Sequence, residues 1–283
     1  MKPFERKVHY MTDKKNLYDR AKQVLMETSR KLFIPISKLP DELEEAVMSA
    51  YLCMRAIDEI EDSAVLSTEE KVNLLNKISV LIKKPFTEAE LAALFEPYQS
   101  SLPAVTLELN DWILLCPESA TPAVLSATSE MAEGMAKWVN KAFNIETEED
   151  LDEYTYYVAG LVGVMLSDLW KWYDGTDCDR VLAVGFGRGL QAVNMIRNRE
   201  EDLSRDGVDF FPNGWEMKDM FTYARRNLDL GDEYTKDLTV GPVYYFCKIP
   251  LALAFSTLDA IEAGQEKLTR NSVMEIVNEV VAE

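Results

Sequence analysis

Apolar side chains recur every three or four residues along most of the chain, the spacing that places them on one face of an α-helix. Proline and glycine fall where such segments need to end, and Asp41, with Glu44 three residues later, matches a capping box. No stretch alternates apolar and polar residues for long enough to favour a strand. We therefore expect helices near residues 14–34, 41–62, 68–83, 87–99, 103–116, 120–143, 149–173, 178–204, 215–226, 232–262 and 266–282.

The chain shows no internal repeat, low-complexity segment or linker between these helices. Its 283 residues are 47% hydrophobic, which is enough apolar material for a sizeable core. The sequence therefore predicts an all-α protein with a single domain over residues 1–283.

The charge is strongly acidic, with 49 Asp and Glu against 30 Lys and Arg and a net charge of −19. A nucleic-acid binder needs a basic surface, so this balance argues against nucleic acid as a partner. An anionic protein can still bind an anion if its carboxylates hold metal cations that bridge to it.

Cysteine and histidine usage excludes several kinds of site. The four cysteines show no close pairing, which is typical of reduced thiols in a cytoplasmic protein, and a single histidine argues against His-based triads and His-ligated zinc. The N-terminus lacks the apolar core of a signal peptide. The apolar stretch 240–258 contains Lys248, so we expect a buried helix there rather than a transmembrane anchor.

The segment 41–62 places carboxylates on an apolar helix face. Its apolar stripe includes Val47 and Met54, and the same stripe continues to Asp58 and Asp62, with Glu61 beside them. Anions on a core-facing stripe are costly unless a cation compensates them, and Mg²⁺ prefers carboxylate oxygens. A solvated acidic helix end is the alternative, and this pattern alone leaves it open.

The segment 178–204 repeats the arrangement with amides. Gln191, Asn194, Asn198 and Asp202 share one face, and the last three are spaced so that their oxygens could reach one ion. A helix that emerges into solvent is again the alternative. If the two helices pack antiparallel across a cavity, metal ions and a diphosphate would be held between them.

The segment 149–173 is apolar nearly all round and should be central. Gly160 and Gly163 permit the close approach of a neighbour or a ligand. Tyr154, Trp170 and other aromatic residues here could line an apolar cavity and stabilise a carbocation through their ring faces. Plain core packing of these rings is the alternative.

Five ordered segments make the chain resemble the squalene/phytoene synthase family, and squalene synthases more than phytoene synthases. The segments are YLCMRAIDEIED, YTYYVAGLVG, LQAVNMIRNREED, DFFPNGW and YYFCKIPLALAFSTL. The resemblance as a whole covers most of the chain, from about Thr28 to Arg270. The resemblance implies the all-α isoprenoid synthase fold, a helical bundle with a central cavity.

The resemblance also implies roles for individual residues. Catalysis would involve Tyr154, through ionisation of the first substrate, and the motif residues Asp58, Asp62 and Asp202. Mg²⁺ would be bound by Asp58, Glu61, Asp62, Asn194, Asn198 and Asp202. The substrate would contact Ser29, Arg30, Tyr51, Arg55, Val158, Leu166, Gln191, Asn194, Arg197, Phe246, Cys247 and Pro250.

The implied reaction is the head-to-head condensation of two farnesyl diphosphates, followed in squalene synthases by rearrangement and reduction with NADPH. The implied partners are a prenyl diphosphate and, peripherally, a membrane that receives the lipid product. We expect no counterpart of the membrane anchor of eukaryotic members, and a monomer and a homodimer both remain open.

Several positions depart from the family pattern. Asn198 replaces the first aspartate of the second motif, and Asp168 reverses the charge of an arginine. Lys248 stands inside the FCKIP segment, and the basic stretch linked to NADPH is reduced to Lys267–Arg270. These changes argue against the reductive step more than against the first ionisation.

Two other functions remain open. The spacing of Asn194, Asn198 and Asp202 is similar to the second metal motif of class I terpene synthases, which would give a single-substrate enzyme that forms a cyclic terpene or farnesol. The other is an inactive protein that binds prenyl lipids, against which the retained Asp58, Glu61 and Asp62 argue.

Overall fold

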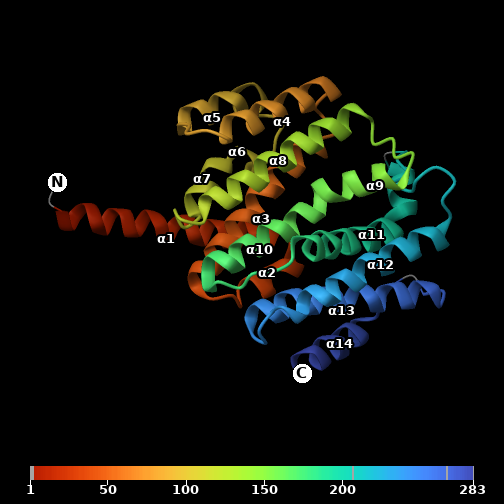
Figure 1. The fold of residues 1–283 in the computed structure, drawn as a ribbon. Helices are drawn as coiled ribbons and strands as arrows, with labels where there is room; N and C mark the ends of the chain where they lie inside the picture. The colour runs from red at the N-terminus through yellow and green to blue at the C-terminus, as the bar shows by residue number, and fades with distance from the viewer. Residues whose placement is uncertain (1–2, 206, 266, 283) are drawn as a thin grey trace. The chain divides into compact units, whose positions relative to one another are not determined.

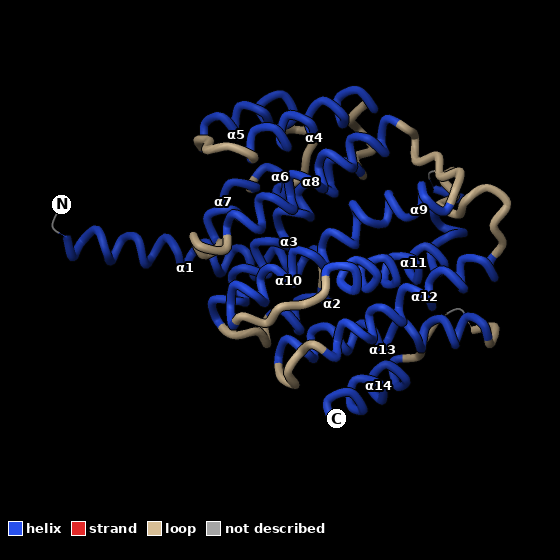
Figure 2. Tube along the Cα trace, viewed as in Figure 1, coloured by secondary structure: helices blue, strands red, loops and turns tan. Residues whose placement is uncertain are grey.

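The computed structural model of the chain describes the backbone of residues 3–205, 207–265 and 267–282, and the side chains of these ranges except 3–13, 30, 31 and 205. All regular elements in these ranges are helices joined by turns and loops (Figure 2), which confirms the all-α prediction. The chain divides into two compact units, Met1–Ala136 and Lys137–Glu283. A single domain over the whole chain stays a prediction.

The first unit is built around one buried helix, α3, which packs against α1, α6 and α7. Most of α3 is buried, and buried hydroxyl groups fix its neighbours: Ser49 Oγ donates to the Trp112 carbonyl at 2.7 Å, and Thr106 Oγ1 donates to the Ala56 carbonyl at 3.0 Å. In chain order (Figure 1) the helices are α1 (Pro3–Thr28), α2 (Arg30–Ile36), α3 (Asp41–Glu61), α4 (Thr68–Ile82), α5 (Glu88–Phe95), η1 (Glu96–Tyr98), α6 (Ala104–Leu107), α7 (Leu109–Leu115) and α8 (Thr121–Asn140), whose last residues belong to the second unit.

The first unit differs from the prediction at two helix starts, and the expected helix 103–116 is interrupted at Glu108. The expected helix 14–34 is broken at Ser29, whose Oγ accepts a hydrogen bond from the Leu32 N–H at 3.3 Å and so caps α2. The capping box at Asp41 is wrong, because Asp41 is already helical and the cap residue is Pro40. The Glu44 side chain instead turns to α1, where it accepts from the Tyr18 hydroxyl at 2.8 Å.

The second unit is built around α11, which packs along α12, α10 and η2. The helices are so close that a Cβ on Gly163 would lie 2.2 Å from the Ala183 carbonyl oxygen, and one on Gly187 would lie 2.2 Å from that of Ala159. The unit contains α9 (Glu148–Thr155), the π-helix η2 (Tyr156–Gly160), α10 (Leu161–Asp174), α11 (Arg180–Arg205), α12 (Met217–Lys236), α13 (Pro242–Glu262) and α14 (Arg270–Ala282).

The expected break between residues 226 and 232 is wrong. Gly231 lies inside α12, where a Cβ would lie 2.9 Å from the Phe186 ring, so this glycine serves close packing rather than a turn. The chain turns instead before Pro242, which begins α13. The expected helix 149–173 is also interrupted, by η2.

The remaining expectations concern thiols and the membrane. All four cysteines are free, and Cys178 is the least buried of them. Within the described residues, no helix combines the length and the apolarity that a membrane span requires.

Candidate metal centre

The C-terminal end of α3 gathers three carboxylates. Asp58, Glu61 and Asp62 each offer an oxygen, and the three oxygens lie within 4.8 Å of one another. Glu61 is only 9% exposed, Asp58 is half-buried and Asp62, the C-cap residue, is exposed. The cluster therefore reaches from the core of the first unit to its surface.

Burial and mutual repulsion raise the pKa of two of these carboxyl groups. The pKa of Asp58 is raised to about 6, mainly by burial and then by the charge of Asp62, although Arg55 opposes the shift. The pKa of Glu61 is raised well above its ordinary value by burial, then by the charges of Asp58 and Asp62. A bound cation would relieve this repulsion.

Two basic side chains already lie beside the cluster. Arg55 Nη1 is 2.6 Å from Asp58 Oδ2, and Arg55 Nε donates to Glu59 Oε1 at 2.9 Å. Lys71, from α4, donates to the backbone carbonyl of Glu61 at 2.6 Å. Glu59 is not among the predicted site residues, although its spacing of four residues from Arg55 is the one that allows an ion pair on a helix.

The amide set on α11 is held by an arginine of the same helix. Arg197 Nη2 donates to Asn194 Oδ1 at 3.2 Å, and Arg197 Nε donates to Asn198 Oδ1 at 3.1 Å. Asp202, two turns beyond Asn194, is half-buried. Both amide oxygens thus already accept from a cationic group, and metal binding by Asn194, Asn198 and Asp202 stays a prediction.

The loop that follows α11 is tied back to the helix. Arg199 makes two hydrogen bonds to Asp209, at 2.7 and 3.2 Å, and its guanidinium lies 3.9 Å from the centre of the Phe211 ring. Nothing in the spacing of these residues indicated the pair, because the loop conformation brings them together.

Tyr154 lies in an aromatic cluster of the second unit. Its ring stacks on Phe210 at 5.2 Å between centroids and meets the edges of Trp138 and Phe143 at 5.5 and 6.2 Å. Tyr154 is 6% exposed. Phe143 has a φ of 54°, a left-handed backbone that is uncommon for a bulky residue and that local packing must support.

The other predicted substrate contacts are distributed over both units. Ser29 caps α2, and the Arg30 side chain lies outside the described residues. Phe246 meets Trp170 edge-on at 5.8 Å, and Cys247 is buried. The half-buried members of the set are Ser29, Tyr51, Val158, Leu166, Gln191, Phe246 and Pro250.

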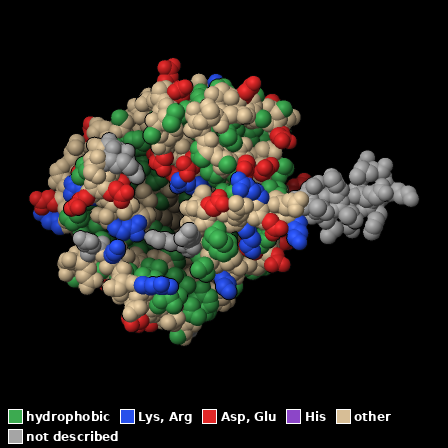
Figure 3. All heavy atoms as spheres, turned by 180° about the vertical axis from the view of Figure 1, so that it is seen from behind, with side chains coloured by type: hydrophobic (Ala, Val, Ile, Leu, Met, Phe, Trp, Pro, Cys, Tyr) green, Lys and Arg blue, Asp and Glu red, His purple; other side chains and the backbone are tan. Residues whose placement is uncertain are grey.

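Two of the departures from the family pattern have partners in the second unit. Asp168 forms an ion pair with Arg180, at the start of α11, and Lys248 Nζ lies 2.6 Å from Asp232 Oδ1 on α12. More generally, acidic and basic side chains are interspersed on the face of the molecule drawn in Figure 3. These substitutions are therefore accommodated by local ion pairs.

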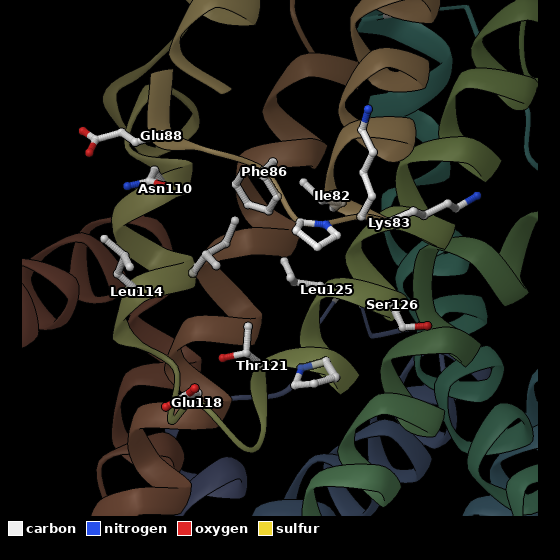
Figure 4. A pocket seen from close by; sticks show the side chains of 14 residues that line it. Ile82, Lys83, Phe86, Glu88, Asn110, Leu114, Glu118, Thr121, Leu125 and Ser126 are labelled. Carbon is white, nitrogen blue, oxygen red and sulfur yellow. The ribbon is translucent and has the colours of Figure 1, made fainter. Parts of the chain in front are cut away.

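A groove of about 750 Å³ lies on the first unit, between the α4–α5 loop, α7 and the start of α8 (Figure 4). Its apolar side chains include Phe86, Leu114 and Leu125, one from each of these segments. The described residues that line it include none of the predicted site residues. The groove is therefore separate from the carboxylate cluster in composition and chemistry.

The helices adopt the all-α isoprenoid synthase fold, as a comparison with solved structures shows. The structure matches that of TcSQS in complex with the ligand BPH1237 with a TM-score of 0.77 and 23% identity, over 94% of this chain and 86% of that one. It matches a dehydrosqualene synthase with a TM-score of 0.59 and 20% identity, over 96% and 97% of the two chains.

The sequence identifies the family within this class. The family model described as squalene/phytoene synthase matches residues 25–215, and the chain belongs to that family, as its motifs predicted.

The similar proteins include squalene synthases of several organisms. The squalene synthase of Schizosaccharomyces pombe is 29% identical over 86% of this chain and 59% of that protein, and that of Eremothecium gossypii is 31% identical over 90% and 64%. The human squalene synthase is 28% identical over 93% of this chain and 68% of that protein. The chain thus spans about three fifths of the length of the first two relatives.

Proposed function

We propose that this protein is a Mg²⁺-dependent isoprenoid synthase that ionises a prenyl diphosphate and condenses two farnesyl diphosphates head to head. The observation that carries the proposal is the Asp58–Glu61–Asp62 cluster, whose oxygens converge within 4.8 Å and whose buried members have raised pKa values. The likeness to squalene synthases supports the choice of substrate and reaction.

The chemistry of the cluster fits Mg²⁺. Its donors are carboxylate oxygens from one helix end, and magnesium is bound in proteins by one or two carboxylates together with waters and phosphate oxygens. Asp58, Glu61 and Asp62 would hold the ion, which would supply positive charge to the diphosphate leaving group.

The chain's own residues would bind and orient the substrate around that charge. Arg55, already beside Asp58, would contact the diphosphate oxygens, and Arg197 would do the same from α11. Tyr154 and the half-buried apolar residues Val158 and Leu166 would enclose the prenyl chain and exclude water from the carbocation.

A single-substrate enzyme on the same scaffold is the second candidate, and Asn198 favours it. Asn198 supplies a neutral oxygen that already accepts from Arg197, so the second motif offers fewer negative charges than two aspartates would. Such a site could ionise one farnesyl diphosphate and release a cyclic terpene or farnesol. Use of NADPH stays an expectation that the short basic stretch Lys267–Arg270 weakens.

The purified protein with farnesyl diphosphate and Mg²⁺ distinguishes these functions. Diphosphate release and extractable products are measured with and without NADPH. Squalene formed only with NADPH supports the reductive condensing enzyme, and a C30 product without NADPH supports condensation alone. A C15 terpene or farnesol in both conditions supports the second candidate. No diphosphate release rejects both functions.

Substitutions of single carboxylates test the role of the cluster. Asp58→Asn removes a proposed magnesium ligand and is expected to lower diphosphate release by about 10²-fold or more. Glu133→Gln, which changes an exposed carboxylate that pairs with Lys83 in the same unit, should keep wild-type activity. Equal activity of the two variants would contradict the role of the cluster.

A further inference from the structure

An arginine of α11 that the proposed function does not use contacts α9, just before the π-helix η2 begins. Arg188 Nη2 donates to the backbone carbonyl of Asp152 at 2.8 Å, and Arg188 Nε lies 3.7 Å from Asp152 Oδ1. Asp152 stands on α9, four residues before η2 begins. Arg188 on α11 therefore binds the last turns of α9, which lead into the π-helix.

The contact is enclosed by groups from a third helix. The Tyr223 hydroxyl, on α12, donates to Asp152 Oδ1 at 2.7 Å and lies 3.1 Å from Thr155 Oγ1. Burial raises the pKa of Tyr223, so its hydroxyl keeps its proton at neutral pH and remains a donor. Three helices thus converge on one carboxylate and one carbonyl group.

The guanidinium is costly in this place. The Arg188 side chain is 23% exposed, and its Nε–H is buried without a hydrogen-bond acceptor. An unmade hydrogen bond on this half-buried side chain disfavours the folded state and offsets part of what its contacts with Asp152 contribute. Arg188 is therefore placed by its contacts with Asp152, at the cost of one unmade hydrogen bond.

The neighbouring residue fixes the other end of the same segment. The Ala159 carbonyl oxygen lies where a Cβ on Gly187 would come within 2.2 Å, so the backbone of η2 rests directly on α11. Within η2 the Leu161 N–H donates to the Tyr156 carbonyl five residues back, the wide turn of a π-helix. Arg188 thus holds the chain four residues before the wide turn, and Gly187 lets the last residues of the turn rest on α11.

The wide turn sets the direction of side chains before it. If it tightened to an ordinary helix, the residues on its N-terminal side would rotate by about 100° relative to α10, because each α-helical residue turns by that angle. Tyr154 would then leave its stack on Phe210.

We propose that Arg188 is a positioning residue, which holds the π-helical turn and thereby aims Tyr154 and Val158 at the prenyl chain. The proposal rests on the proposed function, because it gives the two side chains their role. Small displacements of groups around a reacting centre can lower turnover by one or two orders of magnitude.

The test compares Arg188→Met, which keeps the bulk of the side chain without its donors, with Arg188→Lys, which keeps the charge. Arg180→Met is the control, because Arg180 lies on the same helix and pairs with Asp168 near the surface. Backbone hydrogen exchange of residues 152–161 is followed by mass spectrometry, and kcat and KM are measured for diphosphate release. Arg188→Met is expected to exchange faster in this segment and to lose about tenfold or more in kcat with KM within about twofold.

Arg188→Lys should recover part of both changes, and Arg180→Met should show neither. Tyr223→Phe, which removes one donor to Asp152 and leaves the ring in place, is the milder variant if Arg188→Met does not fold, and it should shift both readouts in the same direction. Wild-type exchange, or wild-type kcat despite faster exchange, overturns the proposal. If the wild-type protein releases no diphosphate, the proposed function fails, and the exchange data alone decide whether Arg188 holds the turn.

Discussion

The ionised carboxylates of the α3 cluster repel one another, so the stability of the protein should depend on pH. The folded-state pKa of Asp58 is about 6, above the value of about 4 for an unfolded chain. A raised carboxyl pKa contributes stability that is fully present below pH 4 and is lost as the pH rises through 6. At neutral pH the ionised cluster therefore disfavours the folded state.

Asp58→Asn removes this repulsion. In a buffer with a metal chelator, the variant should be more stable than the wild type at pH 7.5, by about 1 kcal/mol after allowance for solvent screening, and the gain should vanish at pH 4. Thermal unfolding at several pH values measures the difference. Glu133→Gln serves as the control, and a gain that is independent of pH would contradict the linkage.

Asn198 is expected to limit metal binding at the second motif, because an amide is a weaker magnesium ligand than a carboxylate. If the proposed function holds, Asn198→Asp should reach half-maximal diphosphate release at a severalfold lower Mg²⁺ concentration. A Mg²⁺ titration of the variant, with Glu200→Gln as an exposed control on the same helix, measures this. An unchanged titration would show that the pair with Arg197 keeps the new carboxylate occupied.

Helix-to-helix contact in the second unit depends on glycine. A Cβ on Gly187 would lie 2.2 Å from a backbone oxygen of η2, which cannot move aside as a flexible side chain can. Gly187→Ala should therefore destabilise the protein by about 1–3 kcal/mol, despite the better helix propensity of alanine. Urea unfolding measures the loss, Glu200→Ala is the exposed control, and equal stability of both variants would show that the helices separate freely.

Element by element, the sequence predicts helices well and their interruptions poorly. Periodicity located α3 and α4 almost to the residue, because each has an apolar stripe at helical spacing. It placed a break near Gly231, which instead packs on Phe186, and it missed the π-helix η2. Both features depend on what a neighbouring helix contributes, and a local pattern carries no such information.

The carboxylates of the site were predictable from the sequence, and the partners of its arginines were not. Asp58, Glu61 and Asp62 could be found from the sequence, since they continue an apolar stripe on one helix. The hydrogen bonds from Arg197 to Asn194 and Asn198 depend on the conformation of the arginine side chain. The contact between Arg188 and Asp152 joins residues that are 36 positions apart in the sequence. Only the folded chain brings such pairs together.

The molecule as a whole carries a net charge of −19, so an anionic ligand should need a metal to approach it. Mg²⁺ together with inorganic pyrophosphate is expected to raise the melting temperature by a few degrees, and pyrophosphate with a chelator should not. Differential scanning fluorimetry measures the shift, which Asp58→Asn should abolish and Glu133→Gln should keep. An equal shift without metal would assign the binding to Arg55 and Arg197 instead.

The wide turn at Tyr156–Gly160 also bears on how the helix tolerates a change in length. A hydrogen bond from Leu161 to Tyr156 loops out one more residue than an α-helical bond would. The surplus residue is absorbed locally, so the flanks keep the faces of a continuous α-helix that is one residue shorter. Deleting one residue here would convert the wide turn into a regular α-helical turn without rotating α9 relative to α10. The same deletion within α10 would rotate the residues that follow it away from their packing partners.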